Sequence, residues 1–103
     1  MSKDIKVLYE IRYMAIMKNT IKEMGLNYDE INENQVECRL PHGRVIINSE
    51  IGQIRYDSMD EIAVNEIKQN YQVNFYKDRA IREGMKLKQE VKANGEIHLY
   101  LTR

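Results

Sequence analysis

The sequence predicts an α+β fold in which helices cover one face of a mostly antiparallel sheet. Three observations support this prediction. Segments of two-residue alternation, typical of half-buried strands, occur before and after stretches with the three- and four-residue spacing of helices. Turn residues separate neighbouring strand segments by only a few positions, which favours antiparallel pairing. No proline-, glycine- or serine-rich linker divides the 103 residues, so we expect a single domain spanning 1–103.

The N-terminal third predicts one strand followed by one helix. Residues 4–11 alternate in part and predict a strand, although they also fit the start of the next helix. Residues 13–24 predict a helix, because apolar side chains recur every three or four positions. These side chains are Met14, Met17, Ile21 and Met24. The helix is expected to end at Gly25, which tolerates the left-handed backbone of a helix end.

The middle of the chain predicts three short strands. Residues 27–34 are polar and predict a loop or a short hairpin arm. Residues 35–40 alternate, with Cys38 on the apolar side, and predict a half-buried strand. A turn at Pro41-His42-Gly43 then leads to strands at 44–48 and 53–56. The short links favour an antiparallel meander.

The C-terminal half predicts helix and then hairpin. Ser58-Met59-Asp60-Glu61 fits a capping box, in which the Ser58 side chain accepts from the Glu61 amide. The helical pattern over 58–83 weakens at Gln69-Asn70, so it predicts either one bent helix or two helices. Residues 85–92 and 96–102 alternate around Asn94-Gly95, a dipeptide typical of hairpins. The predicted order is therefore β-α-β-β-β-α(α)-β-β.

The composition argues against several classes of function. Sixteen basic and sixteen acidic side chains give a net charge of zero, so the chain lacks the overall positive charge typical of proteins that bind phosphate backbones. A single cysteine excludes an internal disulfide and favours a reducing, cytoplasmic location. No apolar run is long enough for a membrane span, and the N-terminus does not predict a signal peptide.

The charges are unevenly distributed along the chain. Residues 1–67 hold eight basic and twelve acidic side chains, whereas residues 68–103 hold eight basic and four acidic ones. The two parts therefore carry net charges of −4 and +4. This division either steers a partner or reflects ordinary charge pairing on helix surfaces.

No residue pattern predicts a metal site, a cofactor site or a catalytic constellation. One cysteine and two histidines are too few for the usual paired ligands of a structural zinc site. Cys38 is expected to face the core, which argues against a reactive Cys–His pair with His42 or His98. The acidic residues Asp57 and Asp60 are explained by the favourable field at a helix start.

One surface in the C-terminal third is a candidate for partner binding. Phe75 lies off the apolar stripe of its helix and shares a face with Arg79 and Arg82, a combination typical of protein interfaces and base-stacking surfaces. Alternatively, Phe75 packs beneath a neighbouring loop. Tyr100 is expected opposite Lys86 or Lys88, where a solvated sheet face also explains it. The predicted partner-binding residues are Phe75, Arg79, Arg82, Lys86, Lys88 and Tyr100.

Residues 71–101 carry a spacing that resembles a known family. Tyr71 is followed by Ala80 after nine residues, by Gly84 after four more, and by a hairpin through Asn94-Gly95. This spacing resembles small uncharacterised proteins known as hypothetical reading frames of algal plastids and cyanobacteria, which also occur in other bacteria and phages. The predicted helix that ends at Gly25-Leu26 resembles the first helix of that family. Three positions depart from the family pattern, namely Val73, Met85 and Asn94.

The resemblance implies a role but no chemistry. Members of that family are often encoded beside an AAA+ ATPase, which implies an adaptor or partner role. The family offers no catalytic residue to carry over. We therefore expect a non-enzymatic interaction or accessory module that binds a protein partner or forms a homo-oligomer. The alternatives are a nucleic-acid-binding protein, which would use Lys77 together with the basic and aromatic residues above, and a small enzyme with an unrecognised site.

Overall fold

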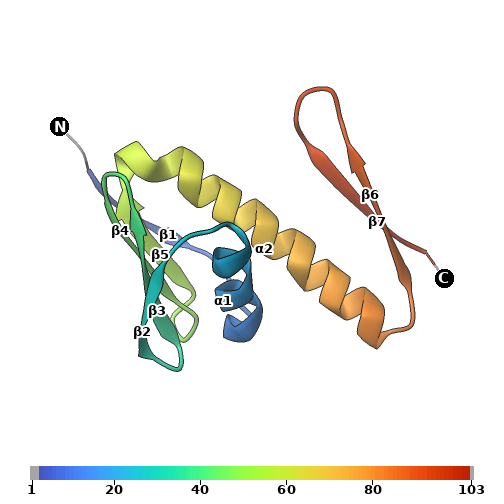
Figure 1. Cartoon of the computed structure of the whole chain (residues 1–103), viewed down its shortest axis with the longest axis horizontal. Coiled ribbons are helices and arrows are strands. Elements are labelled where there is room, and N and C mark those ends of the chain that lie inside the picture. The colour runs from blue at the N-terminus through green and yellow to red at the C-terminus, as the bar shows by residue number, and fades with distance from the viewer. Residues whose placement is uncertain (1–2, 103) are drawn as a thin grey trace.

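The computed structural model describes residues 3–102, and for Leu87, Leu99 and Leu101 it describes the backbone only. The predicted α+β fold is confirmed (Figure 1). The elements are β1 (Asp4–Leu8), α1 (Met14–Glu23), β2 (Tyr28–Asn32), β3 (Gln35–Leu40), β4 (Gly43–Asn48), β5 (Gln53–Asp57), η1 (Ser58–Asp60), α2 (Glu61–Arg82), β6 (Lys86–Val91) and β7 (Ile97–Thr102). The apolar character predicted for the inward side of the hairpin rests partly on three leucine side chains that lie outside the described residues.

The larger sheet has five strands in the order β1-β5-β4-β3-β2, and all neighbours are antiparallel. The predicted meander is present and is one strand longer than expected. The additional strand, β2, lies where the polar segment 27–34 predicted a loop or a hairpin arm, and its register shifts between Glu30 and Asn32. β1 pairs with β5, which closes the sheet on the side away from β2.

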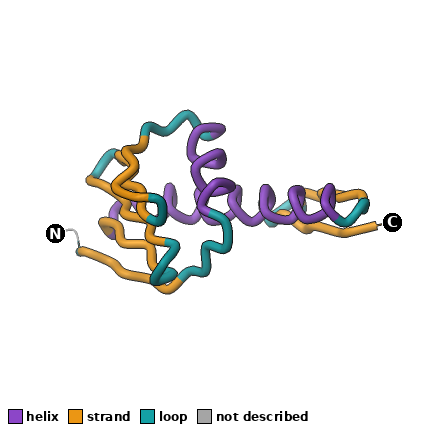
Figure 2. Tube along the Cα trace, turned by 90° about the horizontal axis from the view of Figure 1, so that it is seen from below, coloured by secondary structure: helices purple, strands orange, loops and turns teal. Residues whose placement is uncertain are grey.

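One face of this sheet forms the core. The ladder registers align Val36, Ile47 and Ile54 across β3, β4 and β5, and all three are fully buried. Both helices cover this face, and they contribute Met17, Ile21, Val64 and Ile67 to the same core (Figure 2). The opposite face carries ion pairs such as that of Arg55 with Asp4. Bonding to Arg55 lowers the pKa of Asp4 below its usual range.

Helix α1 ends as predicted and is bound tightly to α2. Gly25 has φ +74°, and the Leu26 amide donates to the Ile21 carbonyl at 3.1 Å, a bond that spans the last turn and satisfies an end carbonyl. The buried hydroxyl of Thr20 accepts a bond of 2.9 Å from the Asn74 side chain on α2. The two helices are therefore held together by a polar contact within an otherwise apolar interface.

Helix α2 is one continuous helix, which decides between the two alternatives left open by the sequence. Its start differs from the predicted capping box. Ser58 bonds Lys3 instead: its amide donates to the Lys3 carbonyl at 2.7 Å, and its hydroxyl accepts from the Lys3 amide at 2.9 Å. The β1–β5 ladder thus continues through Ser58. The Asp57 side chain caps the following 3₁₀ turn by accepting from the Met59 amide, and α2 begins only at Glu61.

The C-terminal half of α2 extends beyond the sheet, and the β6–β7 hairpin packs against it (Figures 1 and 2). We call Asn74 to Thr102, which comprises this half-helix and the hairpin, the arm. The hairpin turn differs from a two-residue Asn-Gly turn, because only Gly95 has a positive φ. The Lys92 amide donates to the Glu96 carbonyl at 2.8 Å, so the loop has three residues, with Gly95 as the left-handed residue of a bulge.

Candidate binding groove

Two contiguous hollows lie between the link from β1 to α1 and one face of α2. The first has a volume of about 280 Å³ and the second about 310 Å³. They meet at Arg12, Phe75 and Arg79, which line both. The full lining comprises Tyr9, Glu10, Arg12, Tyr13, Tyr71, Gln72, Phe75, Tyr76, Asp78, Arg79, Arg82 and Glu83. We call this surface the aromatic–arginine groove.

Aromatic rings form the floor of the groove. Phe75 is half-buried at the centre, where its ring stacks on Tyr13 with 6.0 Å between centroids and meets Tyr71 at 6.2 Å. Tyr76 approaches Phe75 edge-on at 5.5 Å. Tyr13 is the exposed member of this cluster, with 40% of its surface accessible. The groove therefore offers a broad apolar surface on rings whose orientations their neighbours hold in place.

Two tyrosine hydroxyls hold the walls together. The buried Tyr71 hydroxyl accepts from the backbone amides of Arg12 and Tyr13, at 3.0 and 3.4 Å, directly before α1 begins. The Tyr9 hydroxyl donates to the Lys68 carbonyl at 3.1 Å and accepts from Gln72 at 3.0 Å. Burial raises the pKa of Tyr9 above its ordinary value. The loop wall is thus bonded to the helix wall through two tyrosine hydroxyl groups.

Each arginine of the groove is paired with a carboxylate. Arg79 bonds Glu83 at 3.0 Å and Arg82 bonds Asp78 at 2.9 Å; the residues of each pair are four positions apart, and Glu83 is the residue that follows α2. Arg12 lies 3.8 Å from Glu10 on the opposite wall. The Arg82 guanidinium also lies over the Tyr13 ring, 5.3 Å from its centroid. Charges of both signs therefore line the groove in equal number.

The structure brings three of the six predicted partner-binding residues together. Phe75, Arg79 and Arg82 line the groove. Lys86, Lys88 and Tyr100 lie on the hairpin and line neither hollow; Lys88 is the register partner of Tyr100, as expected. Phe75 also contacts the link that precedes α1, so the alternative of packing beneath a neighbouring loop is present in part.

Sequence reasoning missed the loop wall of the groove. Arg12 and Tyr13 lie in the link between β1 and α1, and Tyr71 binds them from a position 59 and 58 residues further along the chain. The only signal in the sequence was the concentration of tyrosine and arginine at the end of the first strand segment. That signal does not indicate which distant helix face the link will contact.

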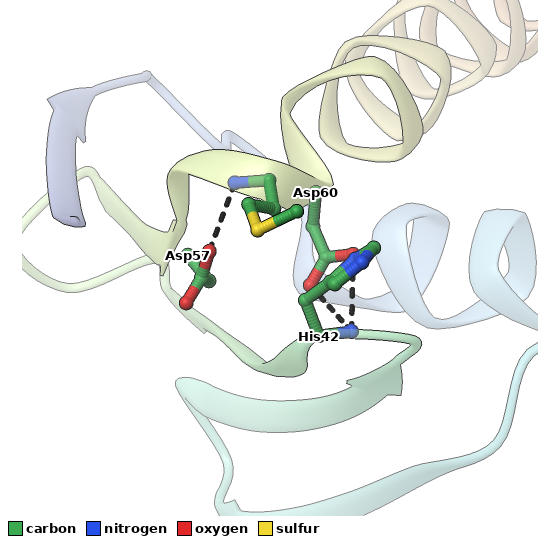
Figure 3. Close-up of polar contacts among 4 residues, drawn as sticks. His42, Asp57 and Asp60 are labelled. Carbon is green, nitrogen blue, oxygen red and sulfur yellow. Dashed lines mark hydrogen bonds and ion pairs between the residues drawn. The ribbon is translucent and has the colours of Figure 1, made fainter. Parts of the chain in front are cut away.

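A buried acid–imidazole pair lies elsewhere in the molecule (Figure 3). Asp60 is 4% exposed, and its carboxylate accepts from the His42 amide and lies 2.9 Å from the Nδ1 atom of His42. The His42 side chain is 44% exposed, so the buried acid orients an imidazole at the surface. The sequence predicted a role for Asp60 at the start of a helix. In the structure, the Asp60 carboxylate instead bonds His42, in the turn between β3 and β4.

Neither Asp60 nor His42 lines the aromatic–arginine groove. Cys38 is fully buried, and burial raises the pKa of its thiol to about 11, so the thiol is neutral at physiological pH. Among residues 3–102, no three His, Cys, Asp or Glu side chains gather as metal ligands, and no helix is long and apolar enough to cross a membrane.

Comparisons with known proteins identify no relative of this chain: no family model, no curated protein and no solved structure matches it. The function must therefore be argued from the groove and the other surfaces of the molecule.

Proposed function

We propose that this protein is a non-enzymatic interaction module that binds a segment of a partner protein in the aromatic–arginine groove. The proposal depends on one observation: the stacked pair of Tyr13 and Phe75 lies between three arginines whose charges are balanced by carboxylates. Tyrosine and arginine are the residues that most often dominate the binding energy of protein interfaces.

The charge balance favours a protein partner over a nucleic acid. A phosphate backbone is bound chiefly by cations whose counterions are released, and each arginine here already has a carboxylate partner. A protein segment carries donors, acceptors and apolar side chains together, and this mixture matches a groove of rings and paired charges. An AAA+ ATPase is the partner class implied by the family resemblance, and we retain it as the first candidate to test.

The proposal is tested by quantitative affinity capture followed by direct binding measurements. Three baits are compared: the wild type, a groove variant with Tyr13→Ala and Arg79→Ala, and a control with Lys86→Ala and Lys88→Ala on the hairpin. We expect a protein that the wild type and the control retain and the groove variant loses. Purified partner should bind the groove variant about 30-fold more weakly, because truncating an interface hot spot costs about 2 kcal/mol.

An identical set of captured proteins for all three baits would contradict the proposal. The same variants distinguish the alternative class of partner. A labelled single-stranded oligonucleotide that binds the wild type, loses affinity steeply with added salt and fails to bind the groove variant would assign the groove to nucleic acid instead. Circular dichroism of each variant verifies that the fold is retained.

A further inference from the structure

Four strands each have one edge without a neighbouring strand among the described residues. These are β1 and β2 at the ends of the five-stranded sheet, and β6 and β7 in the hairpin. Natural proteins protect such edges with charged side chains, prolines or bulges, because unpaired backbone groups otherwise template pairing with another strand. The four edges can therefore be compared by the protection that each one carries.

Three of the four edges are protected. β1 carries Asp4 and Lys6, and β6 carries Lys86, Lys88 and Glu90. β2 carries two acidic residues, and its register shifts before the strand ends. β7 differs from all of them, because its six residues, Ile97–Thr102, include no Asp, Glu, Lys or Arg, no proline and no glycine, and its one basic side chain is the imidazole of His98. Its pairing with β6 also runs without a register shift.

The free edge of β7 presents regularly spaced backbone groups. Because the Lys92 amide donates to the Glu96 carbonyl, the backbone of Glu96 points towards β6. Antiparallel alternation then directs the even-numbered residues of β7 towards β6 and the odd-numbered ones, Ile97, Leu99 and Leu101, away from it. Three amides and three carbonyls therefore line the edge that faces away from β6.

We propose that β7 pairs with β7 of a second copy of this chain, antiparallel about a two-fold axis, to form a four-stranded sheet in the order β6-β7-β7-β6. Among the edges described, pairing β7 with itself is the one combination that brings no Asp, Glu, Lys or Arg side chain onto the shared ladder, and His98 is the one basic residue on it. A two-fold axis presents the same patch to itself, as most homodimers require.

The charges of the arm are compatible with this arrangement. Lys86 and Lys88 lie on β6, which becomes the outer strand on each side. The two outer strands are three strand spacings apart, about 14 Å, which exceeds the screening length of about 8 Å at physiological ionic strength. Pairing also extends a two-stranded ribbon, which is marginally stable by itself, to four strands.

Matching faces restricts the register of the proposed pairing. Side chains directly opposite each other lie on the same face, so residues of equal parity must pair if the two faces of each hairpin are to remain distinct. The two central registers of this kind place Tyr100 opposite either Tyr100 or His98 of the second copy. Both residues lie on the same face of β7, because they are two positions apart in the strand.

Disulfide trapping tests the proposal. In a Cys38→Ala background, the variant His98→Cys plus Tyr100→Cys brings two cysteines into reach of each other in either register. The matched control is Glu90→Cys plus Lys88→Cys, the register partners of the same two residues on β6. We expect mild oxidation to convert most of the first variant to covalent dimer and less than about a tenth of the control, because cross-strand neighbours meet disulfide geometry and outer strands do not.

Equal cross-linking of the two variants, or none in either, would overturn the proposal. Hydrogen exchange of the unmodified protein provides a second readout. The amides of Ile97, Leu99 and Leu101 should exchange more slowly as protein concentration rises, together with an increase in sedimentation coefficient. Exchange at these three amides that does not depend on protein concentration would overturn the proposal. Slower exchange that is seen only when a strand of another protein is added would also overturn it.

Discussion

Asp60 joins two parts of the chain that lie eighteen residues apart. Its carboxylate accepts from the His42 amide at 3.2 Å and contacts the His42 ring at 2.9 Å. The carboxylate has little contact with water, so these bonds are what make its burial tolerable. The pair therefore attaches the turn between β3 and β4 to the start of α2.

The residue pair predicts an unequal effect of two substitutions. Asp60→Ala should lower the free energy of unfolding by about 2 to 3 kcal/mol, because it leaves the His42 amide without its acceptor. His42→Ala removes only the ring contact and should cost about 1 kcal/mol. Urea denaturation measures both values. His98→Ala is the control, since the His98–Glu96 pair is exposed and its loss should change stability by less than about 0.5 kcal/mol. Equal losses for Asp60→Ala and His98→Ala would contradict this account.

Cys38 predicts a pH dependence at the alkaline end. Burial raises its thiol pKa from the ordinary value of 9.0 to about 11 in the folded protein. Below pH 9 the thiol is neutral in both states; between pH 9 and 11 the unfolded chain loses the proton while the folded chain keeps it. The wild type should therefore lose about 2 to 3 kcal/mol of stability across this window relative to Cys38→Ala.

Chemical denaturation at a series of pH values measures that difference. The comparison with Cys38→Ala is needed because burial also raises the pKa values of Tyr9 and Tyr56 in the folded protein. Alkylation provides an independent measurement: the folded protein at pH 8 should react with iodoacetamide only after denaturant is added. Rapid labelling of the folded protein would contradict the burial of this thiol.

At the scale of elements, α2 is the part shared by both sheets. Its first half packs on the five-stranded sheet through Val64 and Ile67, and its second half carries Val73 and Ala80, which are buried outside the main core. The main core continues past the weak apolar pattern at Gln69-Asn70, because Tyr71 belongs to it and Phe75 packs against it. The helix itself continues through this point without a break.

The continuity of α2 predicts a strong effect of proline at its centre. Asn70→Pro should destabilise the protein by about 3 kcal/mol, because proline removes a helical hydrogen bond and clashes with the preceding turn. Asn70→Ala, at the same exposed position, should be neutral or slightly stabilising, since alanine has the higher helix propensity. Thermal unfolding of the two variants tests this. Equal tolerance of proline and alanine would indicate two helices that meet at Asn70.

Elements were predictable wherever a local physical rule decides them. The end of α1 followed from Gly25, β3 followed from alternation, and β4 followed from the β-rich residues after the Pro-His-Gly turn. The start of α2 was mispredicted because the partner of Ser58 is Lys3, a residue 55 positions away. β2 was ambiguous because it is an edge strand with a mostly exposed pattern, so it carries little apolar alternation.

At the scale of the whole molecule, the sheet and the arm differ in charge and in packing. The segment 1–67, which has a net negative charge, contains the five-stranded sheet, α1 and the start of α2. The segment 68–103, which has a net positive charge, contains the arm. The arm extends the molecule, whose principal extents are 47 × 35 × 24 Å. Within the described residues, the hairpin forms a separate sheet, and neither of its strands pairs with a strand of the larger sheet.

This division predicts two levels of local stability. At low protein concentration, hairpin amides such as that of Tyr100 should exchange through a partial opening that costs less free energy than global unfolding. Amides of Val36 and Ile47 in the central ladder should exchange only when the whole domain unfolds. Native-state hydrogen exchange in low urea separates the two, because partial opening depends less on denaturant. A single opening free energy for both regions would contradict the prediction.

Half of the candidate groove was predictable, because local spacing determines one wall and a distant contact determines the other. Phe75, Arg79 and Arg82 share one helix face, and the spacing of the sequence places them there directly. Arg12 and Tyr13 join them only because Tyr71 binds their amides across the fold. Side chains on one helix are related by a local period, whereas the approach of a link to that helix depends on the packing of the entire sheet.

The bonds of the Tyr71 hydroxyl determine at what stage of synthesis the proposed binding groove is complete. Arg12 is translated 59 residues before Tyr71, whose hydroxyl bonds the loop wall of the groove to the helix wall. Under the proposed function, a polypeptide that lacks the helix wall lacks most residues of the binding surface. Recognition through the groove would be restricted to chains that have been translated through Glu83 and have folded.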